Sequence, residues 1–189
     1  MKSSEQFRTE SPESPRDSVD AIALSWRRER PQTPVTSIGV VTRIWQLAKH
    51  FGDDRRLVLA KADVDPATLD LLSVLRRSGP PYTLTTRELA ESSLVTAGAI
   101  SQRLTRAERE NLVVRRPAPG RSRAVLVELT PAGHDLVERT VDRVLNREVE
   151  LLDGLSEEQQ KALAELLRIL LNDMQRKLNV HGVSQVGHP

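Results

Sequence analysis

Arginines are concentrated in one short stretch of this sequence, residues 101–123. The stretch contains seven arginines and two glutamates, a net charge of +5, whereas the whole chain of 189 residues carries only +2. Planar guanidinium groups bind phosphate and carboxylate oxygens through paired N–H donors. The stretch is therefore predicted to bind a polyanion, with an affinity that falls steeply as salt is added.

The element that must position these arginines is a helix predicted over residues 97–110. Thr96 suits its N-cap, and Ile100 and Leu104 fall at the spacing of an inward face. Polar donors suited to base edges and phosphates lie on or near the other face, namely Ser101, Gln102, Arg103 and Arg106. A shorter helix precedes it, because Thr85 and Glu88 have the spacing of a capping box, and it extends to about Ser92.

A β-hairpin is predicted directly after the basic helix. The runs 112–116 and 123–129 are rich in β-branched residues and are joined by a Pro-Gly tip that carries Arg121 and Arg123. Helix, turn, basic helix and hairpin in this order describe a winged helix-turn-helix. The predicted DNA-binding residues are Thr96, Ser101, Gln102, Arg103, Arg106, Arg115, Arg116, Arg121 and Arg123.

Helices are predicted on both sides of this lobe. The first covers residues 18–29 and ends before Pro31. The second is capped by Thr33, has Pro34 at its first position and continues past Gly52 to about Ala62. The others begin at Asp65-Pro66, at Thr130-Pro131 and, through a capping box, at Ser156 and Gln159.

The fold class predicted from these elements is mainly α with a small β-hairpin wing. Residues 64–130 form the DNA-binding lobe, and residues 17–63 and 131–179 form a helical dimerisation region between a disordered tail at 1–16 and a flexible tail at 180–189. The flanking helices carry more apolar stripe than a small core can cover, which predicts a homodimer. Residues 131–179 hold ten acidic and seven basic side chains, a net charge of −3 that suits a subunit interface better than a DNA surface.

Composition argues against several classes of protein. The absence of cysteine excludes disulfides, thiolate metal sites and cysteine redox sensing. The scattered histidines His50, His134, His181 and His188 lack the spacing of a metal pair, so no metal or other cofactor is predicted. No nucleophile and base arrangement indicates an enzyme, and no apolar run predicts a membrane span or a secretion signal, so a cytoplasmic protein without membrane partners is expected.

The sequence resembles the MarR-type winged-helix regulators over residues 35–177. The resemblance is carried by TTRELAESSLVTAGAISQRLTRAERENLVVRR, by the hairpin and by the junction LTPAG at Leu129 to Gly133. It implies a homodimer whose recognition helices enter successive major grooves, while each wing places an arginine in a flanking minor groove. Arg123 matches that wing arginine. The family's wing motif D-P-x-D-R-R is altered, because Ala118 and Arg121 stand where it has aspartates.

The additional helix before Pro31 resembles the urate-responsive (HucR/PecS-like) subgroup of this family. The resemblance implies a ligand site with counterparts at Trp26, Asp70, Arg103 and Arg115. Other roles remain open for each residue. Trp26 also suits a core or an interface, Asp70 a solvated helix surface, and the two arginines phosphate binding.

The predicted function is a DNA-binding transcriptional regulator, in particular a repressor, that binds a pseudo-palindromic operator. A small anionic metabolite such as urate or another purine is predicted to release it. Alternative ligands are a tricarboxylate (citrate or aconitate) and a phenolic compound, because two arginines do not distinguish among such anions. A more distant alternative is a winged-helix module for protein interaction, which the charge of residues 101–123 disfavours.

Overall fold

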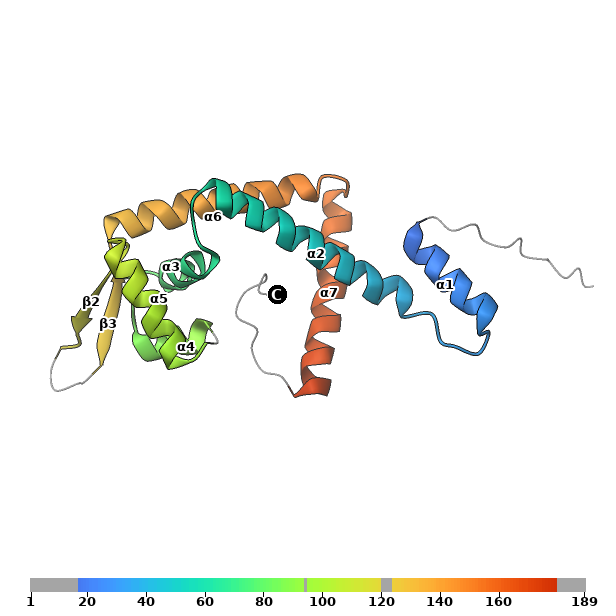
Figure 1. Ribbon diagram of the computed structural model, residues 1–189, viewed down its shortest axis with the longest axis horizontal. Coiled ribbons are helices and arrows are strands. Elements are labelled where there is room, and N and C mark those ends of the chain that lie inside the picture. The colour runs from blue at the N-terminus through green and yellow to red at the C-terminus, as the bar shows by residue number, and fades with distance from the viewer. Residues whose placement is uncertain (1–16, 94, 120–123, 180–189) are drawn as a thin grey trace, which may run out of the picture. The chain divides into compact units, whose positions relative to one another are not determined.

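The computed structural model describes residues 17–93, 95–119 and 124–179 of the chain, which are helical apart from one small sheet (Figure 1). The chain has two compact units, one within residues 1–50 and the other within residues 51–189. Helix α2, Ile38–Lys61, runs from the first unit into the second.

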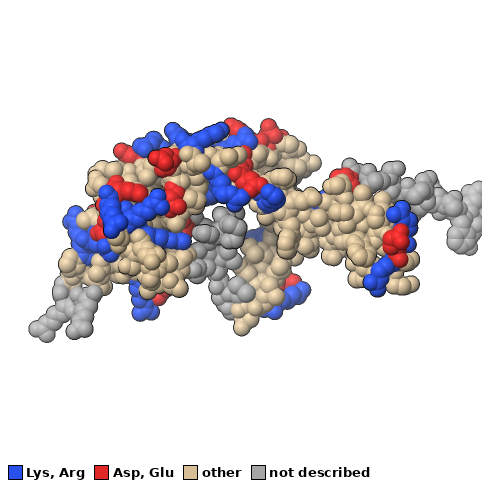
Figure 2. Space-filling view, viewed as in Figure 1, with Lys and Arg blue, Asp and Glu red and all other residues tan. Residues whose placement is uncertain are grey.

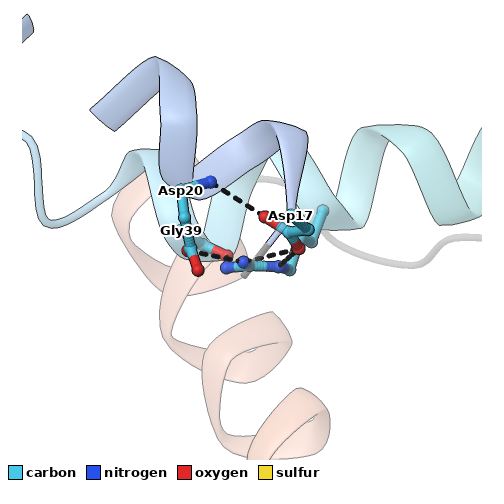
Figure 3. Close-up of polar contacts among 4 residues, drawn as sticks. Asp17, Asp20 and Gly39 are labelled. Carbon is cyan, nitrogen blue, oxygen red and sulfur yellow. Dashed lines mark hydrogen bonds and ion pairs between the residues drawn. The ribbon is translucent and has the colours of Figure 1, made fainter. Parts of the chain in front are cut away.

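The first unit contains α1, Ser18–Glu29, and the first part of α2. Asp17 caps α1, because its side chain accepts the backbone N–H of Asp20 at 2.8 Å. Arg43 of α2 joins the two helices, since its guanidinium donates to Asp17 Oδ2 at 2.7 Å and to Asp20 Oδ1 at 2.7 Å (Figure 3). It also donates to the Gly39 carbonyl at 2.9 Å. Carboxylate and carbonyl oxygens gathered on one guanidinium therefore hold the start of α1 against α2.

The predicted start of α2 at Thr33 and Pro34 is wrong, since the helix begins at Ile38. Val35 is buried, and its carbonyl accepts the N–H of Ile38 at 3.0 Å, so a turn occupies the residues where the first helical turn was expected. The helix then passes through Gly52 without interruption, as predicted.

The second unit is built around α3, Pro66–Arg77, which is buried along most of its length. Asp65 caps this helix and accepts the N–H of Thr68 at 3.0 Å. Helices α4, Thr86–Ser93, α5, Ala97–Arg109, and α6, Pro131–Leu151, all pack against α3 (Figure 1). The fully buried side chains that join them are Leu71, Leu72, Leu75, Leu89, Ile100, Leu104, Val127 and Val137.

A three-stranded antiparallel sheet lies beside these helices, with the strand order β1-β3-β2. The hairpin strands β2, Val113–Pro117, and β3, Val125–Leu129, were predicted. The short strand β1, Thr83–Thr85, was not, and it pairs with β3 so that Leu84 lies opposite Val127. Because β3 is the central strand, it pairs with β2 in the hairpin and with β1, which directly precedes α4.

Helices α6 and α7, Glu157–Leu178, follow the sheet, and the predicted capping residues Thr130 and Ser156 both cap them. Two ion pairs join α6 to the second-unit part of α2: Arg147 Nη2 lies 3.0 Å from Asp54 Oδ1 and Arg55 Nη1 lies 3.1 Å from Glu148 Oε1. No described residue of α7 is buried. The predicted fold class, mainly α with a winged helix-turn-helix, is confirmed.

Candidate nucleic-acid interface

The exposed face of α5 is the centre of the candidate site. Thr96 accepts the N–H of Ala99 at 3.2 Å and so caps the helix, as predicted. Ile100 and Leu104 are buried in the core, whereas Ser101 and Gln102 are exposed. The side chains predicted to meet DNA through this helix therefore share its outer face, with the exception of Arg103.

Arg103 points inward, toward α3. Its Nη1 donates to Asp70 Oδ2 at 3.0 Å, and the side chains of the two residues are only 15% and 11% exposed. The structure thus brings together two of the four residues implied for the ligand site, in an ion pair that is largely shielded from water. Such shielding strengthens the attraction and raises the cost of leaving either charge unpaired.

Arg106 lies on the outer face and is exposed, but it also has carboxylate partners. Its Nε donates to Glu110 Oε1 at 3.0 Å, and its Nη1 lies 3.6 Å from Asp65 Oδ2. These contacts raise the pKa of Arg106, chiefly through the hydrogen bond to Glu110. Asp65 belongs to the cap of α3, so Arg106 connects α5 to the start of another helix.

The arginines of β2 are paired in the same way. Arg115 donates to Glu108 of α5, and this hydrogen bond lowers the pKa of the Glu108 carboxyl and raises the pKa of Arg115. Arg116 Nε lies 3.7 Å from Glu128 Oε2 of β3. Arg115 is half-buried against α5, whereas Arg116 is exposed on the hairpin. Arg115, which the resemblance implies for the ligand site, is seven residues from Glu108 in the sequence and is hydrogen-bonded to it in the structure.

The hairpin tip carries the remaining predicted DNA contacts, Arg121 and Arg123, which lie outside the described residues. At the base of the tip the N–H of Ala118 donates to the Ala124 carbonyl at 2.9 Å, so the two strands stay paired up to this point. The role of both tip arginines stays a prediction.

The carboxylates of this surface are the functional groups that sequence reasoning missed. Figure 2 shows basic side chains over the α5 and hairpin end of the second unit, with acidic side chains among them. Glu110 could have been found from its spacing of four residues from Arg106. Asp65 and Glu128 approach their arginines from other elements, and no local pattern in the sequence indicates this.

Trp26, the fourth residue implied for the ligand site, belongs to α1 in the first unit and is 46% exposed. The exposed part of its ring is an apolar surface on which a further contact could form. Its place in a ligand site stays a prediction from the resemblance.

Metal-binding clusters and membrane-spanning helices are both absent from the part of the chain that the structure describes. Among residues 17–93, 95–119 and 124–179, no three His, Asp or Glu side chains are grouped so that they could hold a metal ion. None of the helices in those ranges is both long enough and apolar enough to cross a membrane.

Comparison with known proteins places this geometry in a family. A sequence model of the MarR family matches residues 62–124, which include α3, the helix-turn-helix and β2. The HTH-type transcriptional regulator PecS of Dickeya dadantii (strain 3937) is 31% identical over 152 residues, which cover 79% of this chain and 90% of PecS.

Solved structures agree with the sequence matches. Wild-type MarR from E. coli in its apo form superposes with a TM-score of 0.58 at 26% identity, over 69% of this chain and 96% of MarR. NadR in complex with 4-hydroxyphenylacetate superposes with a TM-score of 0.55 at 25% identity, over 69% of this chain and 91% of NadR.

Proposed function

The chain belongs to the MarR family of HTH-type transcriptional regulators, and we propose that it is a repressor that binds a pseudo-palindromic operator as a homodimer and is released by a small anion. Transcriptional regulation through DNA binding is the function shared by the family. The operator symmetry, the dimer, the repression and the ligand are the proposed parts. One observation carries the ligand part, the shielded ion pair between Asp70 of α3 and Arg103 of α5.

The ion pair supports a ligand response because it joins the recognition helix to the core through a group that an anion can compete for. A guanidinium carries five N–H donors, and the contact with Asp70 uses Nη1. An anion that binds Arg103 brings a second negative charge beside Asp70, and the two like charges repel in a poorly hydrated place. The repulsion favours a shifted α5, and a shifted recognition helix fits its operator less well.

The same pair ranks the candidate ligands. Urate offers an anionic oxygen to Arg103 and N–H donors to Asp70, so its donors offset enough of the repulsion for it to bind, while its charge still weakens the pair between Arg103 and Asp70. A phenolic acid such as 4-hydroxyphenylacetate, which NadR binds, offers a carboxylate and one O–H donor. Citrate and aconitate place several carboxylates near Asp70, which is unfavourable. Urate or a related purine is therefore the preferred ligand class, with the phenolic acid second and the tricarboxylates third.

The homodimer is supported by the apolar side chains that the described helices leave exposed. On α7 these are Leu163, Leu166, Leu167, Ile169, Leu171, Met174 and Leu178. So long an apolar stripe is unusual for a surface that stays in water, and a second copy of the chain would bury it.

The test begins with enrichment of bound duplexes from a random-sequence library by the full chain. We expect an enriched pseudo-palindrome, whose binding is then measured with urate, 4-hydroxyphenylacetate and citrate added in turn. Urate is expected to release the DNA at the lowest concentration, and a promoter containing the palindrome is expected to be silenced by the protein until urate is added. If no duplex is enriched, the operator proposal is wrong; if a duplex is enriched and none of the three compounds releases it, the ligand proposal is wrong.

A further inference from the structure

The guanidinium of Arg106 lies between two carboxylates on the face of α5 that is proposed to meet DNA. Its Nε donates to Glu110 Oε1 at 3.0 Å, and its Nη1 lies 3.6 Å from Asp65 Oδ2. Both contacts leave the side chain exposed, so it can still reach a ligand in the groove. Any group that binds Arg106 therefore does so close to two negative charges.

Both carboxylates belong to residues at helix ends. Asp65 caps α3, where its Oδ2 also accepts the N–H of Thr68 at 3.0 Å and the Thr68 hydroxyl at 3.3 Å. Glu110 is the C-cap residue of α5, and its backbone N–H donates to the Arg106 carbonyl at 3.1 Å. The cap of α3 therefore holds the Asp65 carboxylate in place, whereas the C-cap fixes the backbone of Glu110 four residues from Arg106 on the same helix, so both carboxylates stay within reach of Arg106.

This arrangement affects neutral and charged acceptors differently. The major-groove edge of guanine presents two neutral acceptors, O6 and N7, that match a guanidinium fork. A backbone phosphate carries a full negative charge, which Asp65 and Glu110 repel. The carboxylates also restrict the side-chain rotamers of Arg106, so less conformational entropy is lost when a base edge is bound.

The same pairing recurs across the surface. Among the described residues of α5 and β2, each arginine except Arg109 contacts a carboxylate. The pairs are Arg103 with Asp70, Arg106 with Asp65 and Glu110, Arg115 with Glu108, and Arg116 with Glu128. The local positive charge is therefore smaller than the sequence of the helix and hairpin indicates. Arg106 is distinguished from the others by its two partners and its place on the outer face of α5.

We propose that Asp65 and Glu110 are specificity-determining residues that hold Arg106 for a guanine edge and oppose its use on the phosphates of other DNA. The inference rests on the proposed operator binding and adds two acidic residues to it. Their contribution is to weaken binding to the wrong DNA, which raises the ratio of operator to non-operator affinity.

The experiment compares the full chain with Glu110→Gln and Asp65→Asn on two duplexes, the enriched operator and a scrambled duplex of equal length and composition. Asparagine is also a good N-cap, so Asp65→Asn preserves the start of α3. We expect both variants to bind the scrambled duplex at least threefold more tightly, and the operator to scrambled ratio to fall. The slope of log K against log salt on the scrambled duplex should steepen by about 0.9 for each additional phosphate that the variant neutralises.

The reciprocal variant is Arg106→Ala. It is expected to weaken operator binding by about tenfold, the range of one bidentate base contact, and scrambled binding by less than twofold. The matched control is Glu157→Gln on α7, which changes the net charge by the same amount and is expected to leave both affinities unchanged. Thermal unfolding of each variant shows whether it is folded.

Two results would overturn the inference while operator binding still holds. One is an unchanged scrambled affinity in both Glu110→Gln and Asp65→Asn; the other is an equal loss on both duplexes in Arg106→Ala, which is the behaviour of a phosphate contact. If the wild-type chain enriches no duplex, the operator proposal itself is wrong and the inference fails with it.

Discussion

Gly133, in the first turn of α6, packs directly against the backbone of Leu112, at the end of the turn that follows α5. A Cβ atom on Gly133 would lie 2.1 Å from the Leu112 carbonyl oxygen and 3.2 Å from a methyl carbon of Leu129. The Leu112 carbonyl cannot move away easily, because it accepts the N–H of Thr130 at 3.1 Å. The chain after α5 and the first turn of α6 can meet this closely only where a residue has no side chain.

We predict that Gly133→Ala destabilises the chain by about 2 kcal/mol or more, since overpacking of this kind forces the backbone to shift. Gly52→Ala is the matched control, because it adds the same methyl group inside α2, where nothing lies within 4 Å. It is expected to stabilise the chain by roughly 0.5 to 1 kcal/mol through the higher helix propensity of alanine. Urea denaturation measures both, and equal effects of the two substitutions would contradict the packing argument.

Asp70→Asn is expected to separate ligand response from DNA binding. The substitution keeps an acceptor for Arg103 but removes the charge that a bound anion repels. We expect DNA affinity within about threefold of wild type and at least tenfold more urate for release, changes of roughly 0.7 and 1.4 kcal/mol. Glu138→Gln, which removes a carboxylate from the exposed ion pair with Arg76, serves as the control. An unaltered urate response in Asp70→Asn would argue against the shielded pair as the responsive element.

Glu108→Gln is expected to change how stability depends on pH. The pKa of Glu108 is lowered, chiefly by the hydrogen bond from Arg115, so the unfolded chain takes up the proton at a higher pH than the folded chain. The stabilisation is therefore complete above the unfolded-state value and is lost as pH falls through the folded value. The free energy of unfolding of wild type should exceed that of the variant at pH 7, and the difference should shrink between about pH 5 and pH 3. A difference that stays constant across this range in urea titrations would be evidence against the pair.

Leu166→Glu is expected to prevent assembly without unfolding the chain. The Leu166 side chain is 65% exposed on α7, so a charge there meets water in one chain but an apolar surface in a dimer. Sedimentation velocity should show a shift from dimer to monomer at micromolar concentrations. Asn172→Glu adds the same charge about 120° around α7 from Leu166, on the side away from the apolar stripe. Dissociation by both variants, or by neither, would contradict the apolar stripe as the interface.

The parts of the fold that could be predicted from the sequence are those set by local patterns, above all the helix starts. The caps at Thr96 and Ser156 and the box formed by Thr85 and Glu88 each involve residues three apart, so the pattern and the hydrogen bond are the same feature. The start of α2 was wrong because the turn at Val35, stabilised by burial, replaced a good N-cap and proline signal. Strand β1 has three residues, too few for an alternating pattern to be detected.

In the candidate site, too, local features could be predicted from the sequence, whereas contacts between distant residues could not. The outward placement of Ser101, Gln102 and Arg106 follows from helical periodicity, and the sequence predicted it. The inward turn of Arg103 depends on Asp70, 33 residues earlier in the chain. The family resemblance named both residues without indicating that they form an ion pair. Contacts across such separations are set by the packing of α3 against α5, and no short window of sequence contains that information.

Thr130 has a hydroxyl group that serves both ends of the junction described for Gly133. It donates to the Asn111 carbonyl at 2.6 Å and accepts the N–H of Gly133 at 3.0 Å, so the residues after α5 and the first turn of α6 share one oxygen atom. Opening either end breaks a hydrogen bond of the other. The backbone amides of Thr130 and Gly133, which donate to the Leu112 carbonyl and the Thr130 hydroxyl, should therefore exchange their protons with solvent deuterium as one cooperative group, at a rate set by the opening of the whole junction.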